Sequence, residues 1–283
     1  MKDSEHRQGG YYLHLLRCFI VTSLQSALAY RANFWIDLLN SALRLATGVL
    51  GIYVLFSRVD SVHGWDLPAA LALLGVYLTL GALRELFMAP SFDALIGMDG
   101  EVWTGRLDFT LIRPVDVQFL ASVRYWRLSA LLDLALALGV LGLAVARLGE
   151  TLTALRLLTF LAALAVGVVI LYAILLAFAG LVFWSPGFLF TWVFDSLFQM
   201  ARYPVGVYPG WLQLVLTWVI PVGLMTSIPA QALAGDLAPG MLLGGAGVAL
   251  LFLVIATSIF RAGVRRYARS EERRVGKECR SRW

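Results

Sequence analysis

Long runs of apolar residues dominate this sequence and leave few folds open to it. Several stretches approach or exceed about 20 apolar residues, the length that an α-helix needs to cross about 30 Å of hydrocarbon. Of the 283 residues, 60% are hydrophobic and 14% are charged, whereas soluble domains contain about 45–50% apolar residues. Because a water-soluble fold could not bury so much apolar surface, we predict an all-α integral membrane protein.

The basic residues mark topology. The formal net charge is +5, but Lys and Arg gather near both ends of the chain and in one central segment, as the positive-inside rule requires of cytoplasmic segments. We therefore expect membrane lipid and no nucleic acid as a partner. Cys18 and Cys279 are the only two cysteines, too few for a disulfide framework or a zinc site.

The hydrophobic pattern predicts six transmembrane helices after an amphipathic segment. In residues 11–30, Leu15 and Phe19 share one helical face while His14 and Arg17 lie on the opposite face, which is typical of a helix lying flat in the membrane interface. The predicted spans cover residues 33–57, 67–88, 127–145, 155–184, 188–203 and 241–260, of which 188–203 supplies the inner part of the fifth.

Residues 203–240 allow two topologies. Residues 211–234 are apolar enough to cross, yet Pro221 and Pro229 interrupt them. A crossing gives seven spans, and a re-entrant outer hairpin before the last span gives six. The even count places both termini and most arginines in the cytoplasm, so we predict the hairpin within a single permease domain of residues 1–269. Residues 270–283 look like a vector-derived scar; a native cytoplasmic tail is the alternative.

Enzyme chemistry finds little support in these residues. A P-loop needs a glycine-rich turn followed by Lys and Ser or Thr, and the chain has no such string: Gly276 and Lys277 are followed by Glu278. The three histidines, His6, His14 and His63, are outside the spans and far apart in sequence. We expect no catalytic residues, no metal and no cofactor bound by this chain.

Two predicted spans carry polar stripes. Charges within a membrane are costly and rarely face lipid, so we take the stripe residues as transport-path candidates: Asp37, Asn40, Arg44, Asp195, Gln199 and Arg202. Arg44 and Asp195 are predicted at similar depth and able to pair. The alternative is that the stripes, which include Ser41 and Gly48, only hold helices together. We interpret Arg84, Glu85 and Asp133 as structural anchors.

The longest polar segment between spans, residues 89–116, is predicted to be cytoplasmic. Residues 92–98 and 101–104 can each form a short helix between Pro and Gly residues. An exposed Trp103 among mixed charges is plausible as a contact with a partner protein. An ordinary solvated loop is the alternative.

The order and spacing of several short strings resemble the permease subunits of type-2 ABC exporters, in particular a subfamily with two dissimilar permeases and one ATPase. These strings are YRANF at 30–34, GRLDFTLIRP at 105–114, RYPVGVYP at 202–209, IP at 220–221 and IPA at 228–230. The resemblance implies a bacterial inner-membrane protein that exports substrate together with a separate ABC ATPase, which holds the ATP and Mg, and with an identical or different second permease.

The same resemblance implies that the segment after the second span carries a helix that couples the permease to its ATPase. The coupling candidates are Phe92, Trp103, Arg106, Asp108 and Arg113. A stand-alone secondary transporter or channel is the alternative function. Co-purification with an ATPase would favour the first function, and flux driven by an ion gradient would favour the second.

Overall fold

A computed structural model shows an all-helical chain. It describes the backbone of residues 2–29, 31–59, 61, 64–148, 153–185, 190–235, 237 and 239–281, and the side chains of residues 10–26, 35–59, 61, 64–148, 153–185, 192–235, 237 and 240–269. No strand occurs within these ranges. The helices form two compact units: Met1–Ala94 with Val115–Glu150 make unit 1, and Leu95–Pro114 with Thr151–Trp283 make unit 2.

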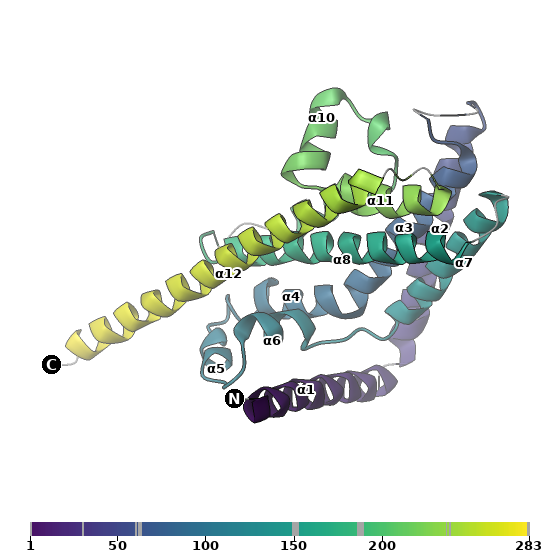
Figure 1. The fold of residues 1–283 in the computed structure, drawn as a ribbon. Coiled ribbons are helices and arrows are strands. Elements are labelled where there is room, and N and C mark those ends of the chain that lie inside the picture. Colours follow the sequence, from purple (N-terminus) through teal and green to yellow (C-terminus); the bar gives the residue numbers. More distant parts are fainter. Residues whose placement is uncertain are drawn as a thin grey trace. The chain divides into compact units, whose positions relative to one another are not determined.

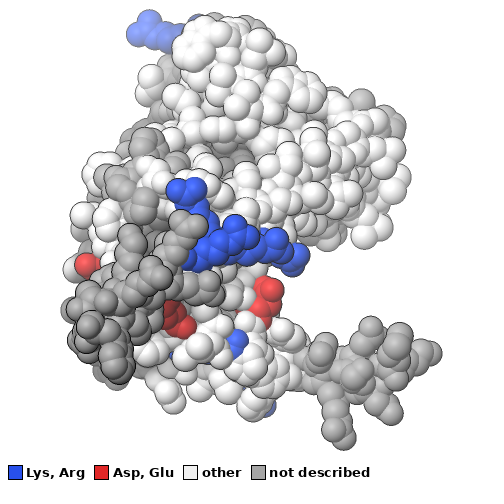
Figure 2. Space-filling model, turned by 90° about the vertical axis from the view of Figure 1, so that its left-hand side faces the viewer, with Lys and Arg blue, Asp and Glu red and all other residues white. Residues whose placement is uncertain are grey.

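Five helices are long and apolar enough to cross a membrane. They are Trp35–Phe56, Leu67–Ile96, Ala130–Leu148, Ala154–Val182 and Gly240–Arg269. A bent helix pair, Gly210–Val219 and Val222–Ala234, adds a sixth candidate. Broad areas of the face in Figure 2 carry no Lys, Arg, Asp or Glu, as lipid contact requires. The prediction of an all-α integral membrane protein is confirmed.

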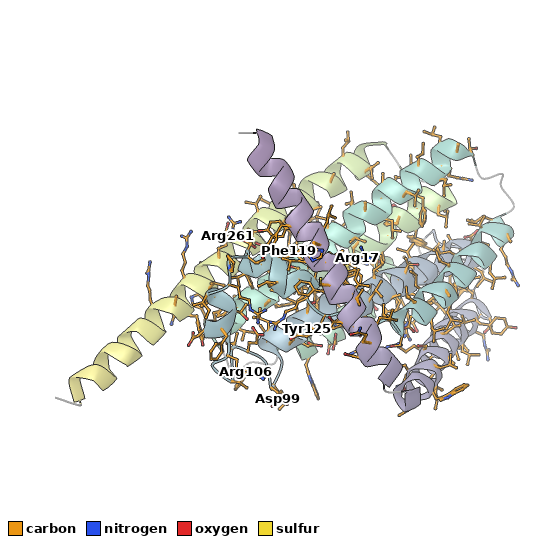
Figure 3. All side chains as sticks on the ribbon, turned by 90° about the horizontal axis from the view of Figure 1, so that it is seen from below. Arg17, Asp99, Arg106, Phe119, Tyr125 and Arg261 are labelled. Carbon is orange, nitrogen blue, oxygen red and sulfur yellow. The ribbon has the colours of Figure 1, made fainter. Side chains whose placement is uncertain are left out.

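Unit 1 consists of seven helical elements (Figure 1): α1 (Lys2–Ala29), α2 (Arg31–Phe56), α3 (Leu67–Leu83), the π-helix η1 (Arg84–Met88), α4 (Ala89–Ile96), α6 (Val117–Val123) and α7 (Ala130–Leu148). α3 is the central helix, since α2 and α7 both pack on it. Gly75 of α3 lies against Leu141 of α7. The amphipathic α1 begins nine residues before the predicted residue 11. Its Tyr12 ring forms a T-shaped pair with the ring of Phe119 on α6, and Phe119 is labelled beside α1 in Figure 3.

The second span extends beyond its predicted end at residue 88. α3, η1 and α4 run without interruption from Leu67 to Ile96. Pro90 lacks the backbone N–H that would pair with the carbonyl of Leu86, and that carbonyl accepts a 2.8 Å hydrogen bond from the N–H of Arg127 instead. The π-turn and this distant donor together let the helix pass through a proline.

Unit 2 contains the remaining elements (Figure 1): α5 (Leu107–Leu111), α8 (Ala154–Val182), α9 (Phe190–Met200), the 3₁₀ turn η2 (Val205–Val207), α10 (Gly210–Leu214), the π-helix η3 (Val215–Val219), α11 (Val222–Ala234) and α12 (Pro239–Ser281). α8 packs on both α11 and α12. Glycines bring the backbones together, since a Cβ at Gly167 would stand 2.6 Å from the carbonyl oxygen of Met225 and one at Gly180 would stand 2.9 Å from the nitrogen of Phe260.

Three predictions for the later part of the chain need correction or stay open. α9 has 11 residues, about 16 Å of rise, and ends three residues before the predicted residue 203; Pro204 follows closely and disfavours helix before it. Residues 188 and 189 lie outside the described residues, and the prediction that 188–203 forms the inner part of a span stays open. α12 continues to Ser281, so the backbone of residues 270–281 is helical, although the sequence there is polar and aperiodic. α10–η3 and α11 meet at 86°, which fits both a broken span and the predicted re-entrant hairpin.

Candidate functional site

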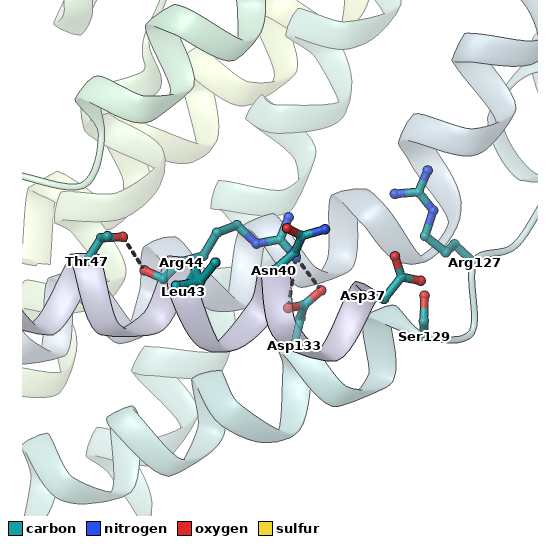
Figure 4. A pocket seen from close by; sticks show the side chains of 8 residues that line it. All are labelled: Asp37, Asn40, Leu43, Arg44, Thr47, Arg127, Ser129 and Asp133. Atoms are coloured by element: carbon teal, nitrogen blue, oxygen red, sulfur yellow. Dashed lines mark hydrogen bonds and ion pairs between the residues drawn. The ribbon is translucent and has the colours of Figure 1, made fainter. Parts of the chain in front are cut away.

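Unit 1 contains a polar cleft beside α2 and α7. Its volume is about 390 Å³, and its lining residues are Asp37, Asn40, Leu43, Arg44, Thr47, Arg127, Ser129 and Asp133. In Figure 4, Asp37, Ser129 and Arg127 lie at one end and Thr47 lies at the other. The cleft gathers three of the six transport-path candidates: Asp37, Asn40 and Arg44.

An ion pair joins α2 to α7 inside this cleft. Nη2 of Arg44 donates to both carboxylate oxygens of Asp133 at 3.0 Å (Figure 4). The Arg44 side chain is 53% exposed and that of Asp133 is 19% exposed, so the pair faces the open side of the cleft. Asp133, interpreted from the sequence as a structural anchor, is thus the carboxylate that Arg44 contacts. The pairing of Arg44 with Asp195, a residue of unit 2, stays a prediction.

The cleft reaches deep into the span. At 1.5 Å per residue, Trp35–Phe56 measures about 32 Å, and Arg44 lies about 13 Å from its start. From Asp37 to Thr47 the lining residues of α2 cover about 15 Å along the helix axis. The cleft residues of α2 therefore extend from near one end of this candidate span to about its middle.

The polar stripe of α2 divides between packing and the cleft. Gly48 is buried, and a Cβ there would meet Leu74 of α3 at 3.0 Å. Ser41 is also buried, and its hydroxyl donates a 2.8 Å hydrogen bond to the backbone carbonyl of Asp37. Asp37, Asn40, Arg44 and Thr47 line the cleft instead. The packing interpretation therefore accounts for Ser41 and Gly48, and the transport path stays a prediction for the residues that line the cleft.

Ion pairs and hydrogen bonds support the end of the cleft at Arg127. Nη1 of Arg127 donates to Oε2 of Glu85 at 2.6 Å, and Glu85 also pairs with the buried Arg84 at 3.4 Å. The buried hydroxyl of Ser91 donates to the carbonyl of Tyr125 at 3.1 Å and accepts from its N–H at 2.9 Å. The segment before α7 is thereby fixed to η1 and α4.

The sequence did not place Arg127 and Ser129 in this site. Both belong to the irregular segment before Ala130, and the predicted third span began at residue 127 as helix. The available signal was the cost of non-helical backbone within a membrane, which is tolerated where protein or a water-filled cavity covers it. Arg44 itself was a further signal, since a charge at that depth requires a carboxylate partner.

The second polar stripe belongs to α9 in unit 2. Asp195 and Arg202 are half-buried, and Gln199 is exposed. Beside this stripe, α9 packs through two buried phenylalanines: Phe194 stacks on Phe198 at 5.7 Å and lies edge-on to Phe178 of α8 at 6.1 Å. Asp195, Gln199 and Arg202 stay predictions for the transport path.

Within the predicted coupling segment of residues 89–116, the part that belongs to unit 2, Leu95–Pro114, is compact within itself. Nη2 of Arg106 donates to the carbonyl of Asp99 at 3.3 Å (Figure 3), and the hydroxyl of Thr110 donates to Glu101 at 2.6 Å. Its helix is Leu107–Leu111, whereas the predicted helix at 101–104 is a series of turns ended by Gly105 at φ +70°.

The coupling candidates differ in exposure. Trp103 is 45% exposed, and Arg106, Asp108 and Arg113 are also exposed. Phe92 is 3% exposed, so its side chain is part of the interior and could affect docking only by positioning α4. No three His, Cys, Asp or Glu side chains gather as metal ligands in the part of the chain that the structure describes.

Several helices that are long and apolar enough to cross a membrane define a multi-pass membrane protein. The chain belongs to the ABC-2 transporter family: residues 42–270 match the family profile described as "ABC-2 family transporter protein". It is therefore an ABC transporter permease, the membrane component of such a system. No curated protein and no solved structure matches the chain.

Proposed function

We propose that this chain is the permease subunit of an ABC exporter whose substrate path includes the cleft between α2 and α7. The observation that carries the proposal is the depth of the cleft, because polar side chains reach about halfway through an otherwise apolar span. If the polar stripe of α2 served only to hold helices together, packing would bury all of its residues, as it buries Ser41 and Gly48.

The energy comes from a separate ATPase that holds ATP and Mg and docks on Leu95–Pro114. In this segment of the permease, the exposed apolar residues Trp103, Phe109 and Ile112 lie among exposed charges. This mixture is typical of a protein interface. The internal bonds of Arg106 and Thr110 support this assignment, since a preorganised element loses little entropy on binding.

The chain itself offers a route from this segment to the cleft. α3, η1 and α4 are one continuous helical run that leads directly into Leu95–Pro114, and Ser91 and Glu85 on that run hold Tyr125 and Arg127. A displacement of α4 would therefore move a cleft-lining residue. By linkage, a substrate that prefers one state of the cleft alters nucleotide affinity in the ATPase.

We further propose a bacterial cytoplasmic membrane location with both termini in the cytoplasm and a second permease subunit, identical or different, beside this one. The distribution of arginines supports the orientation. Exposed apolar side chains along α2, such as Leu39, Leu50 and Tyr53, give lipid or another permease a surface to cover.

Affinity purification of the tagged chain from its native membrane, with mass identification of partners, tests the ATPase assignment. We expect an ABC ATPase in the wild-type preparation and a yield at least tenfold lower for Trp103→Ala, because interface tryptophans often contribute about 2 kcal/mol or more. Trp211→Ala is the matched control, since Trp211 is 69% exposed but belongs to α10, far from Trp103 in sequence. It should retain the partner.

Two results would contradict this proposal. Absence of any ATPase from the wild-type preparation, together with ion-gradient-driven flux by the purified chain, would establish a secondary transporter. Equal loss of the ATPase in both tryptophan variants would remove Leu95–Pro114 as the docking element.

A further inference from the structure

One side of α12 in unit 2 is exposed from the apolar part of the helix into its basic end. The apolar residues of this side are 45–76% exposed: Leu243, Leu250, Leu251, Val254 and Ile255. Four exposed basic residues follow in the chain: Arg261, Arg265, Arg266 and Arg269. With successive residues about 100° apart, both groups fall within the same arc of about 160° around the helix axis. The exposed side is therefore continuous, apolar first and then cationic.

Packing on α8 fixes the direction in which this side faces. A Cβ at Gly263 would stand 2.9 Å from the carbonyl oxygen of Gly180. The rings of Phe260 and Tyr267 lie 6.0 and 6.2 Å from that of Phe183. Contacts this close leave α12 little freedom to rotate about its axis. The four arginines, of which Arg261 is labelled in Figure 3, therefore stay on the side of α12 opposite to this contact.

These four arginines have no carboxylate partner in the part of the chain that the structure describes. None of them forms an ion pair or a hydrogen bond with a described residue, and residues 237–270 contain no Asp or Glu. From Arg261 to Arg269 the helix rises about 12 Å. The exposed side of α12 thus concentrates four positive charges over a short length of helix.

The basic end of α12 begins where the hydrocarbon layer of a membrane would end. From Gly240 to Arg261 the helix rises about 32 Å, close to the thickness of about 30 Å of the hydrocarbon core. Arg265 and Arg266 lie about 6–8 Å further along the axis, and the headgroup region adds about 5–8 Å on each side of the core. By length, these three arginines reach the depth of the lipid phosphates.

We propose that the exposed side of α12 binds an anionic phospholipid, with its acyl chains along residues 243–255 and its phosphate against Arg261, Arg265 and Arg266. Clusters of four or more basic residues next to a transmembrane helix are typical of anionic lipid contact, and arginine forms paired hydrogen bonds with phosphate oxygens. The inference is narrower than the general contact of an apolar helix with lipid, because it specifies the charge of the headgroup.

Other occupants fit this side of α12 less well. A soluble anion or an acidic protein surface would meet the arginines but leave the adjoining apolar residues uncovered. A zwitterionic phospholipid would cover the apolar residues, but its headgroup would bring a positive charge to a cluster of positive charges, and like charges repel. One anionic phospholipid matches both parts of the surface at once.

Lipid binding to the detergent-purified permease, measured by native mass spectrometry, provides the test. The probes are dioleoyl phosphatidylglycerol and dioleoyl phosphatidylcholine, which share their acyl chains and differ in headgroup charge. We expect the wild-type chain to bind the anionic lipid at least about tenfold more tightly, since each basic residue near an anionic surface contributes about fivefold. Combining Arg261→Gln with Arg265→Gln should remove most of this preference.

Two control variants separate the site on α12 from a general effect of charge. Combining Arg58→Gln with Arg147→Gln removes the same number of exposed arginines and should leave the preference unchanged. Arg147 lies in the last turn of α7, which is also a candidate span, so it matches the α12 arginines in its place at the end of a helix. Combining Arg261→Lys with Arg265→Lys keeps both charges and should retain most of the preference.

Equal affinity of the wild-type chain for the two lipids, an unchanged preference in the α12 glutamine variant, or an equal loss in the Arg58 and Arg147 control would each overturn the inference. Displacement of the lipid by an equal concentration of glycerol phosphate would establish a site for free phosphate instead. An acidic protein that co-purifies with the wild-type chain and is lost from the glutamine variant would establish a protein interface. None of these results depends on the ATPase or on the cleft, so the proposed function is tested separately.

Discussion

α2 and α8 are both long apolar helices, yet they are built for opposite purposes. α8 of unit 2 packs closely on two helices beyond its exposed first turns, with Gly167 against the backbone of α11 and Gly180 against that of α12. α2 of unit 1 packs through Gly48 and Ser41, while Asp37, Asn40, Arg44 and Thr47 line an open cleft.

The difference shows two ways in which an apolar helix can meet its neighbours. Without a hydrophobic force between helices in lipid, small residues that allow backbone contact hold the bundle together. Such contacts leave no room to adjust. A half-exposed ion pair such as Arg44 and Asp133 can open and reform at small cost, which suits a surface that must bind and release.

Gly167→Ala should produce the largest stability loss, because it disturbs a backbone contact between helices. The new Cβ would stand 2.6 Å from the carbonyl oxygen of Met225, and backbone cannot move aside as a flexible side chain does. We expect thermal unfolding in detergent to show a loss of about 2–3 kcal/mol, within the range for overpacked cores.

Gly244→Ala on α12 is the matched control, since nothing lies within 4 Å of the added Cβ. Alanine favours helix over glycine by about 0.5–1 kcal/mol, so this variant should be neutral or slightly stabilised. If both variants behaved alike, the contact between α8 and α11 would not be rigid, and the contrast with α2 would fail.

The fold class followed from the sequence because span length and apolar composition are local properties. Element boundaries were predicted where no distant group intervenes, as for α8, expected at 155–184 and observed at Ala154–Val182. The end of the second span was not, because the helix passes Pro90 with the help of the Arg127 N–H, a donor 37 residues further along the chain.

The sequence predicted the α2 residues of the candidate site but not their partners on other elements. Helical periodicity alone grouped Asp37, Asn40 and Arg44, since they share one face of one helix. The partner of Arg44 depends on how α7 packs beside α2, and Asp133 is 89 residues away. Sequence could show that Arg44 needs a carboxylate; choosing between Asp133 and Asp195 requires tertiary contacts.

Ser91→Ala should have an intermediate effect and would sharpen the contrast within unit 1. The variant removes the side-chain partner of the backbone N–H and carbonyl of Tyr125, and unsatisfied groups of this kind cost about 1–2 kcal/mol. Thermal unfolding measures the loss. Ser258→Ala is the control, because the Ser258 hydroxyl bonds only within its own helix, to Val254, and is exposed; it should change stability by less than about 0.5 kcal/mol.

A double-mutant cycle on Arg44→Gln and Asp133→Asn should give the smallest stability effect. Because the Arg44 side chain is 53% exposed, we expect a coupling energy in thermal unfolding below about 1 kcal/mol, as for other exposed pairs. Substrate-dependent transport should nevertheless fall in both single variants, since both residues line the cleft. A coupling energy above about 2 kcal/mol would instead make the pair a structural clamp, and α2 would then serve the same purpose as α8.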